Sequence, residues 1–190
     1  LRGSGEEPPD QPQVTGPGEV YNSNAAALAA DLQAAGMDCT VAGIVPDDPE
    51  ALRAAFQRAL AAGTDVILTT GGVSVGPRDR VARVWIELGA RRLLGRIDVK
   101  PGGPFFAGRC GDTWVIGLSG SPASCLATYQ VLVRPFLLRL AGRRRGVRPV
   151  VPAVLAAPFP KPADRPRLLW ARLRGGTAPY EALLPGAGEG

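Results

Sequence analysis

Residues 65–79, DVILTTGGVSVGPRD, place a short apolar run directly before a glycine pair, a hydroxyl residue, a third glycine and a carboxylate. A glycine pair after a strand lets successive backbone N–H groups turn toward one point, and the positive end of a following helix adds to the attraction. Such a loop can hold an anion without lysine. It matches neither the Walker nor the G-x-G-x-x-G pattern, so a plain strand-to-helix turn explains it equally well when it is considered alone.

Helical and strand-like patterns alternate around this stretch. Helices are predicted over 22–36, 46–63 and 80–88, strands over 38–45, 65–70, 96–100, 104–107 and 114–118, and a long apolar helix over 122–140, kinked or broken near Pro135. This alternation predicts right-handed crossovers. The expected fold is therefore α/β, with a mostly parallel sheet covered by helices on both faces in three layers.

The chain divides into three predicted parts. Residues 1–19 are rich in proline and glycine, which indicates a linker and the end of a preceding strand. Residues 20–145 carry the α/β pattern. Residues 146–190 change to short apolar runs between prolines and glycines, which predicts a partial C-terminal β domain. Because the chain begins without methionine, we expect it to be a fragment of a longer polypeptide.

Composition argues against several classes of function. The chain has no histidine, so Ser-His and Cys-His catalysis are excluded. No apolar stretch reaches the roughly 20 residues that span a bilayer, so we expect no membrane partner and a cytoplasmic location. The basic excess lies in residues 134–190, which carry eleven basic and three acidic side chains, whereas residues 1–133 carry eleven basic and fourteen acidic ones, which leaves a net charge of +5. No aromatic residues interleave with the arginines of 143–148, so no nucleic-acid partner is expected.

Polar loops follow the predicted strands, at the sheet edge where ligands bind in such folds. Asp47 and Asp48 each suit the start of the helix that follows them, and Asp79 could cap the next helix. Carboxylates beside a phosphate site are also what a Mg²⁺ ion needs to bridge protein and phosphate oxygens. Lys100, one of two lysines in the chain, comes before Pro-Gly-Gly-Pro. The residues alone leave both interpretations of the acids open.

Five motifs occur in a fixed order along the chain. They are 18–24 (GEVYNSN), 45–49 (VPDDP), 70–76 (TGGVSVG) with Asp79, 99–102 (VKPG) and 117–122 (GLSGSP). In order and spacing they resemble the MoeA and gephyrin E-domain family of molybdopterin molybdenumtransferases. The resemblance implies a molybdopterin-binding domain over 20–145. It also implies an enzyme of molybdenum cofactor biosynthesis, a homodimer that inserts molybdate into adenylylated molybdopterin (molybdopterin-AMP) and releases AMP.

The resemblance also implies roles for individual residues. Asp47, Asp79 and Glu7 are expected to hold Mg²⁺ and to position molybdate. Lys100 is expected to offset oxyanion charge as the phosphoanhydride breaks, and Arg96 keeps a positive charge where a lysine can occur. The expected contacts to the pterin phosphate and nucleotide are Thr70, Gly71, Gly72, Val73, Ser74, Ser119, Gly120, Ser121, Pro122 and Ser124.

The chain departs from the family pattern at Gly103, where a second lysine is common, at Ser119 and Ser121, and at Glu189. The resemblance also implies an N-terminal region and an active site built across a dimer, so the fragment alone is expected to bind ligand yet turn over poorly. Two alternatives stay open. A molybdopterin adenylyltransferase of the same fold shares the glycine loop and the Gly-Ser-Pro turn, and such an enzyme is also a candidate partner. A non-catalytic molybdopterin-binding or scaffold module is the second alternative.

Overall fold

A four-stranded sheet forms the centre of the larger part of the chain. The computed structural model describes residues 22–73, 80–143, 148–159, 164–176 and 179–185. In spatial order the strands are β1 (Val66–Thr70), β4 (Thr113–Leu118), β3 (Pro104–Cys110) and β2 (Arg91–Arg96). β1 pairs with β4 in parallel, whereas β3 pairs antiparallel with both β4 and β2.

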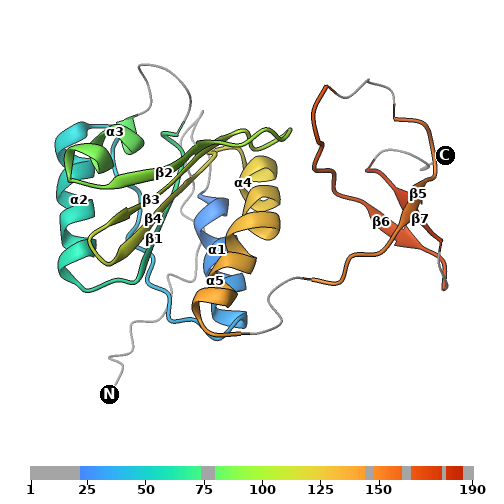
Figure 1. Cartoon of the computed structure of the whole chain (residues 1–190), viewed down its shortest axis with the longest axis horizontal. Coiled ribbons are helices and arrows are strands. Elements are labelled where there is room, and N and C mark those ends of the chain that lie inside the picture. The colour runs from blue at the N-terminus through green and yellow to red at the C-terminus, as the bar shows by residue number, and fades with distance from the viewer. Residues whose placement is uncertain (1–21, 74–79, 144–147, 160–163, 177–178, 186–190) are drawn as a thin grey trace, which may run out of the picture.

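Helices cover both faces of this sheet. One face carries α2 (Pro49–Ala61) and α3 (Arg80–Glu87), and the other carries α1 (Ser23–Ala34), α4 (Pro122–Thr128), η1 (Tyr129–Val133) and α5 (Arg134–Leu140) (Figure 1). The expected α/β class with three layers is therefore confirmed. None of the helices in the described ranges is long and apolar enough to cross a membrane.

Side chains of the central strands fill two separate cores. Because successive residues of a strand point to opposite faces, β4 contributes to both. Val115 packs with α2 and α3, and its neighbour Ile116 packs with the helices of the other face, including Tyr129. Phe56 and Trp85, both buried, stack with their ring centroids 4.0 Å apart and join α2 to α3.

The sheet is mixed rather than mostly parallel, which corrects part of the expectation. Residues 38–45, predicted to be a buried strand, form no strand. Gly43 has a φ of +87°, which interrupts an extended backbone, and the side chains of Val41 and Ile44 are 56% and 78% exposed. The predicted strand at 96–100 is also wrong, because β2 ends at Arg96 and the chain then turns into β3.

The long helix predicted over 122–140 is present and changes its winding before Pro135. α4 runs into the π-helical segment η1, in which the N–H of Arg134 donates to the carbonyl of Tyr129, five residues earlier. Proline has no N–H to donate within a regular helix. The wider turn just before it accommodates this missing donor and lets α5 continue, so the predicted irregularity is confirmed.

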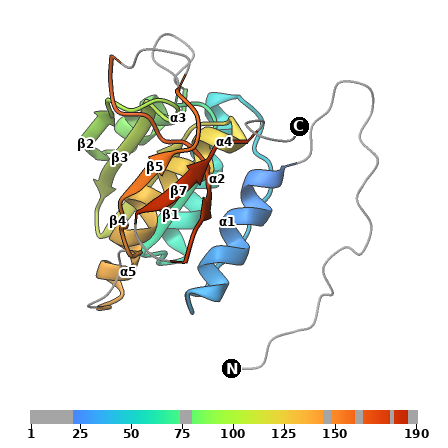
Figure 2. The ribbon, with the colours of Figure 1, turned by 90° about the vertical axis from the view of Figure 1, so that its right-hand side faces the viewer.

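A smaller three-stranded sheet follows the α/β region. β7 (Tyr180–Leu183), which the sequence patterns did not indicate, lies between β5 (Ala153–Leu155) and β6 (Arg172–Arg174). Figures 1 and 2 together place this sheet on the same side of the four-stranded sheet as α1, α4 and α5. The N–H of Lys100 donates to the carbonyl of Pro166 at 3.0 Å, and the carbonyl of Lys100 accepts from Leu168 at 2.9 Å. The boundaries at residues 19 and 145 stay predictions.

Gly117 in β4 makes room for the side chain of Val73, which is 3% exposed. A Cβ atom on Gly117 would overlap with Cγ1 of Val73. The glycine is therefore required by packing across the sheet face. It couples the strand to the loop that follows β1.

We expect Gly117→Ala to lower the free energy of unfolding by about 1 to 3 kcal/mol through overpacking. Val73→Ala should lower it by roughly 1 to 2 kcal/mol because it opens a cavity. The double variant should lose clearly less than the sum, since alanine at 73 lacks the overlapping methyl groups. Denaturant titration of the four proteins measures this coupling, and strictly additive losses would contradict the packing.

Asp31 connects α1 to the helical segments beside it. Its carboxylate accepts hydrogen bonds from the hydroxyl of Tyr129 at 2.9 Å, from Nε of Arg134 at 2.8 Å and from the amide of Gln130 at 3.4 Å. Nη2 of Arg148 lies 3.7 Å from the second carboxylate oxygen. Burial by itself would raise the pKa of Asp31, but these hydrogen bonds outweigh it and hold the pKa below its ordinary value.

Acid should therefore weaken the fold partly through Asp31. A carboxyl whose pKa is lowered by folding stabilises the protein above the pKa of the unfolded chain, and this contribution is lost as the pH falls through the folded pKa. Below about pH 4, the free energy of unfolding of the wild type should fall more steeply with pH than that of Asp31→Asn. Urea titrations at several pH values measure both slopes, and parallel slopes would contradict the prediction.

Candidate functional site

Three loops meet at one edge of the four-stranded sheet. β1 and β4 are parallel, so the loops that follow them leave the sheet on the same side. β3 runs antiparallel to β4, so the turn over 97–103 that leads into β3 lies at that edge as well. The loops expected to bind the ligand from positions 70–74, 96–100 and 119–124 are thus brought together, as far as their residues are described.

The turns after β1 and β4 touch through their backbones. Gly71 donates its N–H to the carbonyl of Leu118 at 2.9 Å and has a φ of +86°. A Cβ on Gly120 would lie 3.4 Å from the Cα of Gly71. Thr70, the last residue of β1, pairs with Leu118 and leads into this contact. The N–H of Gly71 is used in this contact, so the donors that the two turns can offer to one ligand are their other backbone N–H groups.

Gly72 and Val73 join the first turn to the core. Gly72 has a φ of +67°, and a Cβ there would overlap with the side chain of Val81 in α3. The carbonyl of Gly72 accepts from the N–H of Val81 at 3.4 Å. Because the side chain of Val73 is buried against Gly117, any ligand contact of Val73 would come from its backbone.

The second turn leads directly into α4. Ser121 precedes the helix in an extended conformation and accepts the N–H of Cys125 with its carbonyl at 2.8 Å, while its hydroxyl makes no capping hydrogen bond. Pro122 is the first residue of the helix. Ser119, Gly120 and Ser121 are at least partly exposed. The hydroxyl of Ser121 is therefore not used by the helix start.

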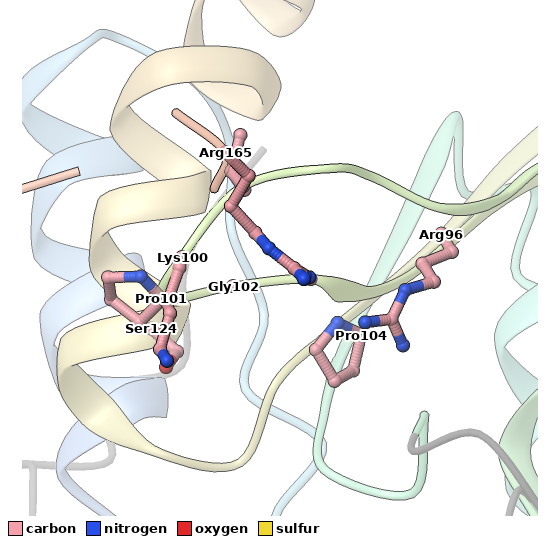
Figure 3. Close-up of a pocket in the computed structure, with 9 residues that line it drawn as sticks. Arg96, Lys100, Pro101, Gly102, Pro104, Ser124 and Arg165 are labelled. Atoms are coloured by element: carbon pink, nitrogen blue, oxygen red, sulfur yellow. The ribbon is translucent and has the colours of Figure 1, made fainter. Parts of the chain in front are cut away.

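A pocket of about 370 Å³ lies between the 97–103 turn, α4 and the chain near Arg165 (Figure 3). It is lined by the predicted site residues Arg96, Lys100 and Ser124, and by Arg165, which no sequence motif indicated. The guanidinium groups of Arg96 and Arg165 point toward one another in Figure 3. Three cationic side chains and a hydroxyl group around one cavity suit a small oxyanion.

Ion pairs and nearby backbone hydrogen bonds hold Arg165 at this pocket. Its guanidinium lies 3.7 Å from a carboxylate oxygen of Asp98 and 2.8 Å from Asp164. The hydrogen bond from Arg165 holds the pKa of Asp164 below its usual range. Backbone bonds between Lys100 and residues 166–168 fix this segment against the turn. Only the folded structure could identify Arg165, because its role depends on this long-range pairing.

The two aspartates before α2 have different roles. Asp48 caps the helix, since its carboxylate accepts the N–H of Ala51 at 2.9 Å. Asp47 does not cap the helix, and its side chain is 69% exposed. Its carboxylate lies 3.6 Å from Nη1 of Arg80, and the same Nη1 also donates to the Asp47 carbonyl. Arg80 begins α3 directly after Asp79 in sequence. Asp47 therefore keeps oxygen atoms available for a cation.

The other two predicted metal ligands, Glu7 and Asp79, and the predicted contact Ser74 lie outside the described residues. Among the residues whose positions are given, no group of three or more acidic or cysteine side chains could hold a metal ion. The metal set therefore stays a prediction, with Asp47 as its only described member.

Asn24 lies in the 18–24 motif, but the sequence did not indicate its contact with a site turn. Its Nδ2 donates to the carbonyl of Gly120 at 2.8 Å, and the residue is 7% exposed. Two asparagines occur at the start of α1, and only one of them is needed to cap the helix. Asn22 caps the helix by accepting the N–H of Ala25, so Asn24 was free for another contact.

The family described as "probable molybdopterin binding domain" (MoCF_biosynth) matches residues 12–139. The chain belongs to this family. The resemblance drawn from the five motifs is therefore confirmed. Curated relatives include a molybdopterin molybdenumtransferase of Nostoc sp., 35% identical over 144 residues that make up 74% of this chain and 32% of the relative. Another from Bacillus subtilis is 32% identical over 146 residues, 77% of this chain and 34% of the relative.

Solved structures agree with this assignment. A molybdopterin biosynthesis MoeA protein from Pyrococcus horikosii superposes with a TM-score of 0.72 at 29% identity, covering 96% of this chain and 43% of that chain. MogA, at 24% identity and a TM-score of 0.54, covers 64% of this chain and 90% of that chain and shares the fold. The chain spans about a third of the length of the curated relatives it matches.

Gly102 shapes the turn that carries Lys100. It has a φ of +106°, and a Cβ there would overlap with Oγ1 of Thr128 in α4. We expect Gly102→Ala to lower the free energy of unfolding by at least about 1 kcal/mol more than Gly89→Ala. Gly89 has a φ of +87° with open space around it, so it reports backbone strain alone. Equal losses in denaturant titrations would show that the contact with α4 is unimportant.

Proposed function

We propose that this chain forms the molybdopterin-binding part of a molybdopterin molybdenumtransferase, which inserts molybdate into adenylylated molybdopterin and releases AMP. The observation that carries the proposal is the position of the cationic pocket, lined by Arg96, Lys100 and Arg165, at the same sheet edge as two touching glycine turns. Membership of a molybdopterin-binding family and relatives named molybdenumtransferases support the choice of substrates.

The two halves of this edge suit different parts of the reactants. Backbone N–H groups of the glycine turns favour phosphate oxygens, and the unused hydroxyl of Ser121 is a further donor. Lys100, Arg96 and Arg165 favour a compact oxyanion such as molybdate. These same cations would stabilise negative charge that develops on the departing AMP. Adenylylated molybdopterin would then lie across the edge, with its reacting end toward the pocket.

Mg²⁺ belongs to the proposal as the counter-ion of the phosphate groups. The exposed carboxylate of Asp47 fits such a hard cation, because its oxygen atoms are not used to cap α2. Asp79 and Glu7 would complete the protein ligands. When bound, the ion would neutralise phosphate charge, while Asp47 would orient the phosphate end through it.

Further parts of the proposal concern partners and location. We propose a cytoplasmic homodimer that receives its substrate from a molybdopterin adenylyltransferase. Nucleic acid is not expected as a partner, because several arginines of the basic region bond within the chain. Arg143 donates to the carbonyl of Ala35 at 2.6 Å, and Arg174 pairs with Glu181.

The test is AMP release from adenylylated molybdopterin in the presence of Mg²⁺ and molybdate. We expect release to require molybdate. Lys100→Ala and Arg165→Ala should each lower the rate by roughly ten- to a hundredfold, because each removes a cationic side chain that lines the pocket. Arg83→Ala, which removes an arginine that is 80% exposed on α3, is the matched control and should keep the wild-type rate.

Other outcomes would favour the alternatives. Consumption of ATP with unmodified molybdopterin would indicate an adenylyltransferase. If the chain binds the ligand without turnover, a longer relative carrying an Asp79→Ala equivalent should be added as partner. Failure of that mixture to release AMP would favour the non-catalytic binding or scaffold module.

A further inference from the structure

Asn24 ties the start of α1 to the glycine turn after β4. Its Nδ2 donates to the carbonyl of Gly120, 96 positions away in sequence, at 2.8 Å. The acceptor is a carbonyl, so the atom that faces it must be the amide nitrogen. Gly120 and Ser121 are exposed, so little else among the described residues covers this turn. The hydrogen bond from Asn24 therefore holds this turn against the start of α1.

The stability of the fold does not account for this asparagine. Its Oδ1 is buried and has no hydrogen-bond partner in the part of the chain that the structure describes. Burial of an unpaired carbonyl oxygen opposes folding. The carbonyl of Gly120 lies on an exposed residue and could bond to water if the side chain were absent. An apolar residue of similar size would therefore fit this position at least as stably.

The bond does have a geometric consequence. The turn that it holds is in backbone contact with the turn after β1, where a Cβ on Gly120 would lie 3.4 Å from the Cα of Gly71. The separation of these turns fixes the separation of their N–H groups. A ligand that bonds to both turns is sensitive to a shift of about 1 Å between them.

We propose that Asn24 is a positioning residue of the ligand site. By holding the Gly120 turn against Gly71, it presets the distance between the two turns and so raises the affinity for the phosphate end of the ligand. This inference rests on the proposed function, which assigns the two turns to adenylylated molybdopterin.

The test compares Asn24→Leu with Asn22→Ala in the whole chain. Asn22 lies at the start of the same helix, where it accepts the N–H of Ala25 at 3.2 Å, so its loss weakens α1 without touching the turn. Asn24→Leu should keep the Tm within about 2 °C of the wild type. Amides of 119–121 should exchange roughly tenfold faster, and the Kd for adenylylated molybdopterin should rise roughly tenfold or more. Asn22→Ala should lower the Tm and leave the Kd unchanged.

Asn24→Asp gives a second measurement that does not depend on how leucine packs. It keeps the size of the side chain but turns a carboxylate oxygen toward the Gly120 carbonyl, so it should also raise the Kd. If the wild type binds adenylylated molybdopterin and both variants bind and exchange like the wild type, the inference is overturned and the proposed function stands. If the wild type binds none, the proposed function fails and the ligand role of Asn24 falls with it. The exchange rates of 119–121 then decide whether Asn24 holds the turn.

Discussion

The parallel pairing of β1 with β4 is the interaction on which the rest of the site depends. It sets Thr70 opposite Leu118, so the chain leaves both strands at the same level and Gly71 meets Gly120. An antiparallel pairing would have sent the two turns to opposite edges. The same pairing also requires a residue without a side chain at Gly117, because the loop after β1 folds back onto that position. Core packing and the arrangement of the backbone donors are therefore set by one strand pair.

The positive charge at this edge comes from segments that are far apart in the sequence. Arg96 is the last residue of β2 and Lys100 lies in the connection from β2 to β3, whereas Arg165 comes from the segment that pairs with the backbone of Lys100. Nη2 of Arg96 lies 3.5 Å from where a Cβ of residue 103 would be. Gly103 is the position at which the family resemblance implies a second lysine. Arg96 thus supplies a cation beside the position where this chain carries none.

Local patterns predicted the elements whose signals are local. The strand at 65–70, the capped helix after Asp48 and the irregular helix before Pro135 follow from apolar periodicity, capping and a missing N–H. The strand predicted at 38–45 is absent, because an apolar run does not show whether a neighbouring strand is available for pairing. Gly43 also interrupts the extended backbone there. Arg165 and Asn24 were missed for a related reason. Their contacts join residues that are far apart in the sequence, and local spacing does not predict such contacts.

Two polar side chains on the α1 and α4 face of the sheet share a feature that lowers stability. Oδ1 of Asn24 and Oγ1 of Thr128 are both buried without a hydrogen-bond partner among the described residues, and each residue lies against a glycine of a site loop. Unpaired buried oxygens oppose folding, so neither is explained by stability. Such groups persist where the surrounding structure holds a functional geometry at some cost to the fold. Asn24 and Thr128 therefore each combine an unpaired buried oxygen with a contact to a site loop, and the apolar packing of the two cores offsets the loss.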